Sequence, residues 1–161
     1  MNDFLNQVVY FGFFQSLFLL LLYAFSPKNR RNINVYTVIF VAVLLIGLTG
    51  RVIYTSEIWG KSYRFIAVSE FATLFFGPTV YLFTKSSLQH RNFQWRHLLH
   101  YIPGILYILV ILFGYILLSD AAINARVKSG ELFRMVSLLL GTALVVNITY
   151  WAFSLSVFLK V

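Results

Sequence analysis

Five long runs of apolar residues alternate with short polar connectors along the chain. About 20 residues of helix, at roughly 1.5 Å per residue, cross the hydrocarbon core of a bilayer. Each run is long enough to form one such helix, and connectors this short favour antiparallel neighbours. We therefore expect an all-α membrane helix bundle, a single domain over 1–161, with about five transmembrane helices at residues 4–25, 35–54, 63–84, 98–118 and 133–159.

The composition points to the same class of protein. Of the 161 residues, 60% are hydrophobic and only 11% are charged, whereas soluble domains carry roughly 25% charged residues. The first apolar run lacks the basic start and the cleavage site of a signal peptide, so we expect it to be a retained helix. Without cysteine, the sequence excludes disulfides, thiolate catalysis and cysteine-based zinc sites.

Charged residues in the connectors predict the orientation. The first and third connectors and the C-terminus lie on one side of the membrane and carry seven basic residues. The other side carries six, so the count of basic residues alone does not decide the orientation. The first connector is the densest, with Lys28, Arg30 and Arg31, and the acids gather on the opposite side. Because cytoplasmic loops are enriched in Lys and Arg, we expect the N-terminus outside and the C-terminus in the cytoplasm. The opposite side has four acids: Asp3, Glu57, Asp120 and Glu131.

The three histidines, His90, His97 and His100, are the candidate metal ligands. His97 and His100 have the i, i+3 spacing that can hold a metal on one helix face. All three lie in one stretch, however, and no Asp or Glu is near them in the sequence. We expect histidines at the membrane interface, with no metal and no cofactor.

Other chemistry is sparse. The sequence has no nucleophile motif, no paired carboxylates and no Gly-rich phosphate loop, so we expect no enzyme. Aromatic and basic residues mix in "SLQHRNFQWRH", which at the end of a spanning helix predicts a membrane-surface anchor. Because basic residues are split between the two membrane faces, we expect no direct DNA binding by this chain.

Small and polar residues inside the apolar runs predict helix contacts. Ser69, Thr73 and Gly77 form a small-xxx-small series, and Ser137 with Gly141 forms another. Such spacing lets helix backbones approach closely in lipid. Asn147 lies well inside the last run and should face another helix rather than lipid.

Glu70 is the one acidic residue within a spanning run. With Thr73, Gly77 and Tyr81 it forms a stripe of polar and small residues that should meet another helix. Arg51 lies near the outer end of the preceding helix, at similar depth, so we predict an Arg51–Glu70 contact. The alternative is a glutamate that reaches water alone at the interface.

Gly77 and Pro78 should weaken the third helix. Pro78 lacks the N–H that would bond to the carbonyl of Leu74, and its ring crowds that carbonyl. Gly77 removes side-chain bulk, so we predict a bend and a close neighbour there. Pro103 lies near the first turn of the next helix, where proline is tolerated.

The segment "FFGPTVYLFTKSSL" followed by "HLLHYIPGILYIL" resembles the membrane-embedded N-terminal half of AraC-type transcriptional regulators of Bacteroidetes. The first part of the pattern matches at Gly77, Pro78, Tyr81, Lys85 and Ser86, and the second part matches at His100 and Pro103. The resemblance implies a sensory or anchoring bundle in the bacterial inner membrane. It also implies a last helix that enters the cytoplasm and joins a helix-turn-helix domain.

No recognition helix follows within this chain, so we expect either a membrane-half fragment or a stand-alone relative with a different function. Two other classes stay open. One is a non-catalytic structural subunit of a larger membrane complex. The other is a small proton-coupled transporter that uses Glu70. We expect the partners to be the lipid bilayer and other membrane helices or further copies of the chain.

Overall fold

In the computed structural model, residues 2–26, 34–56, 63–89 and 93–160 are described, and these ranges contain helices and no strands. The predicted all-α class is therefore confirmed. Five helical segments are long and apolar enough to cross a membrane, in agreement with the five predicted runs. They are Phe4–Phe25, Val35–Ser56, Phe65–Gln89, Trp95–Ile116 and Glu131–Phe158. The basic cluster at Lys28, Arg30 and Arg31 lies outside the described residues, as do Glu57 and His90.

The first two spans are single helices, whereas the third and fourth change helix type along their length. The first two are α1 (Asn2–Phe25) and α3 (Val35–Ser56), and the last is α8 (Glu131–Phe158). The third span consists of α4 (Tyr63–Ser69), a 3₁₀ turn η1 (Glu70–Ala72) and α5 (Thr73–Gln89). The fourth consists of a 3₁₀ helix η2 (Trp95–Tyr101), α6 (Ile102–Ile111) and a π-helical turn η3 (Leu112–Ile116).

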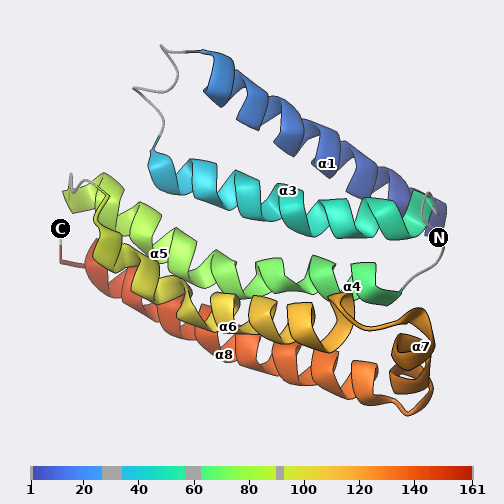
Figure 1. Cartoon of the computed structure of the whole chain (residues 1–161). Coiled ribbons are helices and arrows are strands. Elements are labelled where there is room, and N and C mark those ends of the chain that lie inside the picture. The colour runs from blue at the N-terminus through green and yellow to red at the C-terminus, as the bar shows by residue number, and fades with distance from the viewer. Residues whose placement is uncertain (1, 27–33, 57–62, 90–92, 161) are drawn as a thin grey trace.

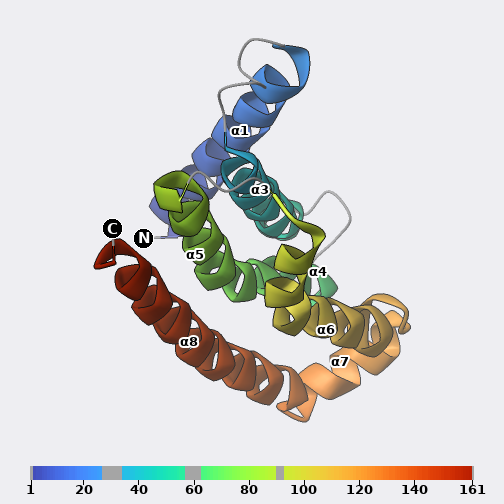
Figure 2. The same cartoon turned by 90° about the vertical axis from the view of Figure 1, so that its left-hand side faces the viewer.

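The third span occupies the middle of the bundle. It packs against α3 on one side and against α6 and α8 on the other (Figures 1 and 2). Helix α1 lies at the edge, where α3 is the element it packs against. The start of α1 and the end of α8 lie at opposite ends of the bundle (Figure 1). An odd number of crossings requires this arrangement.

A short helix, α7 (Asp120–Lys128), lies in the segment that was expected to be a simple connector. Its N-cap is Ser119, whose hydroxyl accepts a hydrogen bond from the N–H of Ala122 at 3.4 Å. Asp120 lies in the first turn, and Arg126 and Lys128 lie in the last. These charges interact favourably with the helix dipole. At nine residues and with little apolar character, α7 does not span but covers one end of the bundle.

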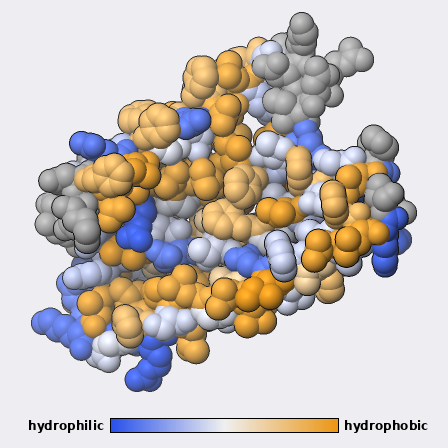
Figure 3. Space-filling view, turned by 180° about the vertical axis from the view of Figure 1, so that it is seen from behind, coloured by the Kyte–Doolittle hydropathy of each residue, from blue (hydrophilic) through white to orange (hydrophobic). Residues whose placement is uncertain are grey.

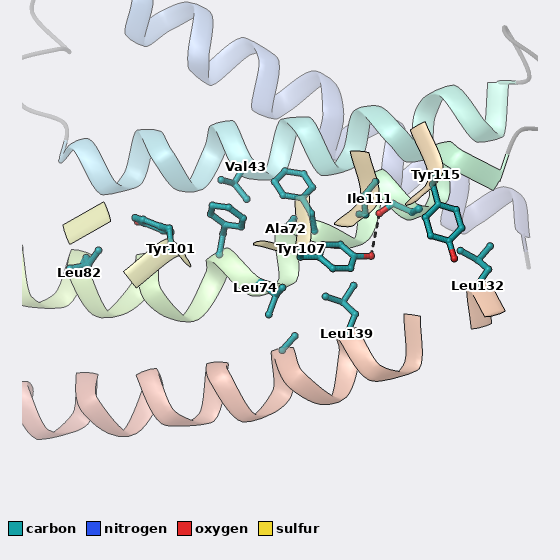
Figure 4. Close-up of a cluster of buried hydrophobic side chains, with 14 of the residues drawn as sticks. Val43, Ala72, Leu74, Leu82, Tyr101, Tyr107, Ile111, Tyr115, Leu132 and Leu139 are labelled. Carbon is teal, nitrogen blue, oxygen red and sulfur yellow. Dashed lines mark hydrogen bonds between the residues drawn. The ribbon is translucent and has the colours of Figure 1, made fainter. Parts of the chain in front are cut away.

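Aromatic side chains from several helices fill the core (Figure 4). Phe75 on α5 stacks on Tyr101 of η2, with ring centroids 5.5 Å apart. Its ring lies so close to Gly104 that a side chain there would collide with it. Tyr107 reaches back and donates a hydrogen bond to the carbonyl of Ala67 at 3.5 Å. The core thus joins the third and fourth spans through rings rather than through aliphatic residues alone.

Two glycines on α3 allow the backbone of the third span to approach it. A Cβ on Gly50 would lie 2.7 Å from the carbonyl oxygen of Phe65, and one on Gly47 would lie 3.0 Å from the Cβ of Ala72. The predicted small residue Ser69 lies in this contact, where its backbone faces both glycines. The small-residue prediction for Ser69 is therefore confirmed.

The second small-residue prediction is wrong. Ser137 and Gly141 on α8 are exposed, and a Cβ on Gly141 would have nothing within 4 Å among the described residues. The reason is rotational, because the face of α8 that packs inward runs through Leu132, Leu139 and Ala143. Spacing alone does not tell which face of a helix turns inward.

Large apolar side chains cover much of the outer surface. Phe11 on α1 is 70% exposed and Trp151 on α8 is 66% exposed. From behind, the surface is mainly hydrophobic along the helices, and hydrophilic residues gather mostly toward the two ends (Figure 3). In water such a surface would be an aggregation hazard, whereas in a bilayer it faces acyl chains.

Candidate functional site: polar contacts between the helices

Asn147 on α8 forms a two-sided hydrogen bond with the backbone of α5. Its Oδ1 accepts from the N–H of Gly77 at 2.7 Å, and its Nδ2 donates to the carbonyl of Thr73 at 3.1 Å. In a regular α-helix these two backbone groups would bond to each other. The amide of Asn147 therefore bonds to both backbone groups of this turn of α5, directly before the position where Pro78 offers no N–H. The prediction that Asn147 faces another helix is confirmed.

Gly77 is required at this contact. A Cβ there would lie 2.6 Å from Oδ1 of Asn147 and 3.0 Å from its Cα. Only a residue without a side chain lets the two helix backbones approach so closely. The predicted close neighbour at Gly77 is therefore present.

The predicted distortion at Pro78 takes a different form. Helix α5 continues through Pro78 from Thr73 to Gln89, and the change of helix type comes earlier, in the 3₁₀ turn Glu70–Ala72. Pro78 offers no N–H to the ladder, and the Asn147 amide bonds to the N–H of Gly77 and the carbonyl of Thr73 beside that gap. Pro103 lies in the first turn of α6, as predicted.

The predicted contact between Arg51 and Glu70 is present. Nη2 of Arg51 lies 3.2 Å from Oε1 of Glu70, and the two side chains are 46% and 17% exposed. The hydroxyl of Ser69 lies 3.4 Å from the same carboxylate oxygen. Since Glu70 is mostly covered and paired, it does not reach water alone.

The stripe that starts at Glu70 meets two helices instead of one. Glu70 contacts α3 through Arg51, whereas Thr73, Gly77 and Tyr81 contact α8. The 3₁₀ turn at 70–72 has about 3.0 residues per turn instead of 3.6. Residues three apart eclipse in such a turn, so Glu70 stays in line with Thr73 but is rotated relative to Gly77 and Tyr81.

Tyrosine and histidine side chains form a second polar contact near the C-terminal end of the bundle, here called the Tyr81 cluster (Tyr81, Lys85, His100 and Tyr150). Nδ1 of His100 is hydrogen bonded to the hydroxyl of Tyr150 at 2.9 Å. The ring of Tyr81 lies edge-on to His100, with centroids 5.5 Å apart. Nζ of Lys85 lies 5.6 Å from the centroid of the Tyr81 ring. The cluster joins α5, η2 and α8.

His97 takes a different partner from His100. Its Nδ1 is hydrogen bonded to the hydroxyl of Tyr36, a fully buried side chain at the start of α3. The two histidines thus tie η2 to α3 and to α8. In the described parts of the chain, no group of three His, Asp or Glu side chains is placed to hold a metal ion.

Some contacts in the site had no clear signal in the sequence. The Tyr–His pairs join residues 50 and 61 positions apart, and tyrosine is common near membrane interfaces, so neither pair stands out. Gly47 and Gly50 do have a readable signal, because two small residues three apart suit a close helix contact.

Compared with known proteins, the chain matches no family model, and no curated protein or solved structure matches it either. Three polar contacts lie at successive depths in the bundle: Arg51–Glu70, Asn147 with α5, and the Tyr81 cluster. Each joins the third span to another span, and two of them involve α8.

Proposed function

We propose that this chain is a non-catalytic sensory or anchoring module of the bacterial inner membrane, which passes a signal to a cytoplasmic DNA-binding domain. The observation that supports this function best is the Asn147 amide in the backbone ladder of α5. It couples the last helix to the one place in the described bundle where the ladder already lacks a donor inside a helix, at Pro78. The proposal also rests on the resemblance of the segment around Gly77 and Pro78 to the input half of AraC-type regulators.

The same proposal puts the C-terminus in the cytoplasm and the N-terminus outside. In the predicted topology, all five acidic residues lie in the half of the bundle that contains the start of α1 and the end of α3. The end where α8 finishes has basic residues only, among them Lys85, Arg96 and Lys160. The positive-inside rule supports a cytoplasmic location for that end.

The size of the coupling follows from the contact itself. Interhelical hydrogen bonds in membranes contribute about 0.6 kcal/mol on average, so the two bonds of Asn147 contribute roughly 1 kcal/mol. Allosteric coupling energies are typically about 1–3 kcal/mol. A ligand or lipid state that alters α5 near Gly77 therefore needs only a modest difference in affinity to change the position of α8. Motion of α8 would then reach the cytoplasmic side directly.

A fusion experiment tests the proposal. A DNA-binding domain that acts only as a dimer is joined after Val161, and transcription from its promoter is measured in bacteria. We expect Asn147→Leu to change transcription at an unchanged level of the protein in the membrane. Thr149→Leu is the matched control, because Thr149 is exposed on the same helix and its hydroxyl donates to the carbonyl of Val145 in its own helix. Equal transcription from the unsubstituted fusion and both variants would contradict a signalling role for the contact.

The exposed face of α1 is the feature that supports the alternative of a structural subunit. This helix packs on α3 and leaves Phe4, Phe14 and Phe18 about as exposed as Phe11. A subunit should purify from its native membrane in a complex of defined stoichiometry, whereas a sensory module should purify as the chain or as copies of it. The transporter alternative gains no support, because Glu70 is paired with Arg51.

A further inference from the structure

A groove runs between α6 and α8 on the side of the bundle away from α3. It has a volume of about 240 Å³, and Leu74 and Pro103 line it together with Val110, Leu138 and Thr142. Leu74 on α5 is buried, and the residues on α6 and α8 form the two walls. All but one of these five residues are apolar. The groove therefore suits a hydrocarbon chain.

The Tyr81 cluster joins the same two spans beyond the groove, because His100 of the fourth span is hydrogen bonded to Tyr150 of α8, and none of its four residues lines the groove itself. On the fourth span, His100 and Pro103 are one turn apart, so they share a face. On α8, Tyr150 follows Leu139, another groove residue, by eleven residues, which is three turns. Three turns rise roughly 16 Å. One leaflet of the hydrocarbon core is about 15 Å thick, half of the roughly 30 Å core.

The basic residues at this end of the bundle indicate that the ligand of the groove is an anion. Lys85 belongs to the Tyr81 cluster, and Arg96 and Lys160 are exposed at the same end of the bundle. No acidic residue of the sequence belongs to this end. When the hydroxyl of Tyr150 donates to Nδ1 of His100, the proton of the neutral imidazole is on Nε2, which is then a donor. The end of the groove thus offers a cation and hydrogen-bond donors to an anion.

We propose that the groove between α6 and α8 binds one anionic phospholipid, with its phosphate at Lys85 and His100 and one acyl chain along Pro103 and Thr142. Polar groups lie on the headgroup side of the apolar walls, and the lining on α8 continues to Met135, deep enough for a whole acyl chain. The ligand is a diacyl phosphatidylglycerol or a lipid of the same charge. This binding site goes beyond the proposed signalling function and does not depend on it.

Binding is measured on the purified full chain in detergent by native mass spectrometry, with titrations of phosphatidylglycerol and of phosphatidylcholine that carry identical acyl chains. We expect phosphatidylglycerol to bind about fivefold more tightly or better, since one basic residue near an anionic surface contributes about 1 kcal/mol. Glycerol 3-phosphate, the headgroup without acyl chains, should not bind in the same concentration range. Equal affinity for the two lipids would overturn the proposal, and so would tight binding of glycerol 3-phosphate.

The headgroup end of the site is located with a pair of variants. Lys85→Gln should reduce the preference for phosphatidylglycerol about fivefold, whereas Lys160→Gln removes a charge at the same end of the bundle and should leave the preference unchanged. Equal losses from the two variants would mean a diffuse surface charge and would overturn the site.

The groove itself is tested with Thr142→Trp, which should fill it and abolish retention of the lipid. Leu144→Trp is the control, because Leu144 is exposed on α8 and lies about 200° around the helix from Thr142. Val110→Trp repeats the test from the opposite wall if Thr142→Trp does not fold. Lipid binding by the filled variants at the original affinity would overturn the assignment.

Discussion

The Gly77 contact permits a quantitative test by substitution of Gly77 and Asn147 singly and together. In Gly77→Ala, the new Cβ would lie 2.6 Å from Oδ1 of Asn147 and 3.2 Å from the Cβ of Tyr150. Overpacking of this kind costs about 1–3 kcal/mol, and loss of the two hydrogen bonds adds roughly 1 kcal/mol. Alanine gains about 1 kcal/mol of helix propensity over glycine. The net expectation is a loss of about 1–3 kcal/mol in the free energy of unfolding.

Asn147→Ala should cost less, about 1 kcal/mol. Once the amide is gone, the N–H of Gly77 and the carbonyl of Thr73 can bond to each other as in any α-helix, so no buried polar group loses its partner. The double variant should therefore be more stable than the sum of the single losses predicts, because an alanine at position 147 no longer presents the oxygen that obstructs the new methyl group at position 77. We expect a coupling of at least about 1 kcal/mol.

The assay is reversible unfolding in mixed micelles, followed by circular dichroism as the fraction of denaturing detergent rises. Gly141→Ala is the matched control, because it makes the same chemical change on an open face of α8 where nothing described lies within 4 Å. It should be neutral or stabilising by up to about 1 kcal/mol. Strict additivity of the Gly77 and Asn147 losses would refute the contact, and so would equal effects of Gly77→Ala and Gly141→Ala.

Two further expectations concern α3. Comparison of Arg51→Gln, Glu70→Gln and the double variant for stability in detergent should give a coupling of about 0.2–1 kcal/mol, because Arg51 is nearly half exposed. Simple addition of the two losses would exclude the pair. Gly50→Ala should destabilise the bundle by about 1–3 kcal/mol, because the obstructing atom is the backbone carbonyl of Phe65, which cannot rotate away. An unchanged unfolding midpoint would mean that α3 lies farther from the third span.

The apolar pattern predicted most of the fold because each spanning helix must satisfy its own backbone. Length and hydropathy are therefore enough to locate the spans, and the structure changes most of their ends by only a few residues. Helix α7 was not predicted, because the only signals for a helix there are local: a cap at Ser119 and charged residues at both ends. These signals also fit an ordinary loop.

The candidate site was predictable where a polar residue had to avoid lipid. Asn147 and Glu70 are such residues, and both meet another helix. Which helix each meets depends on rotation about the helix axis, and the 3₁₀ turn at 70–72 alters that rotation without a clear mark in the sequence. The same dependence on rotation explains why Ser137 and Gly141, with equally good spacing, face outward.

The proposed orientation of the five-span bundle puts the end of α8 in the cytoplasm. The chain has no cysteine, so a single introduced cysteine is a unique label site. Lys160→Cys and Asp120→Cys place that site near opposite ends of the bundle, and both positions are exposed. Intact spheroplasts are treated with a membrane-impermeant maleimide before and after permeabilisation. We expect the Asp120→Cys variant to react at once and the Lys160→Cys variant to react only after permeabilisation. The reverse pattern, or the same reactivity in both variants, would rule out this orientation.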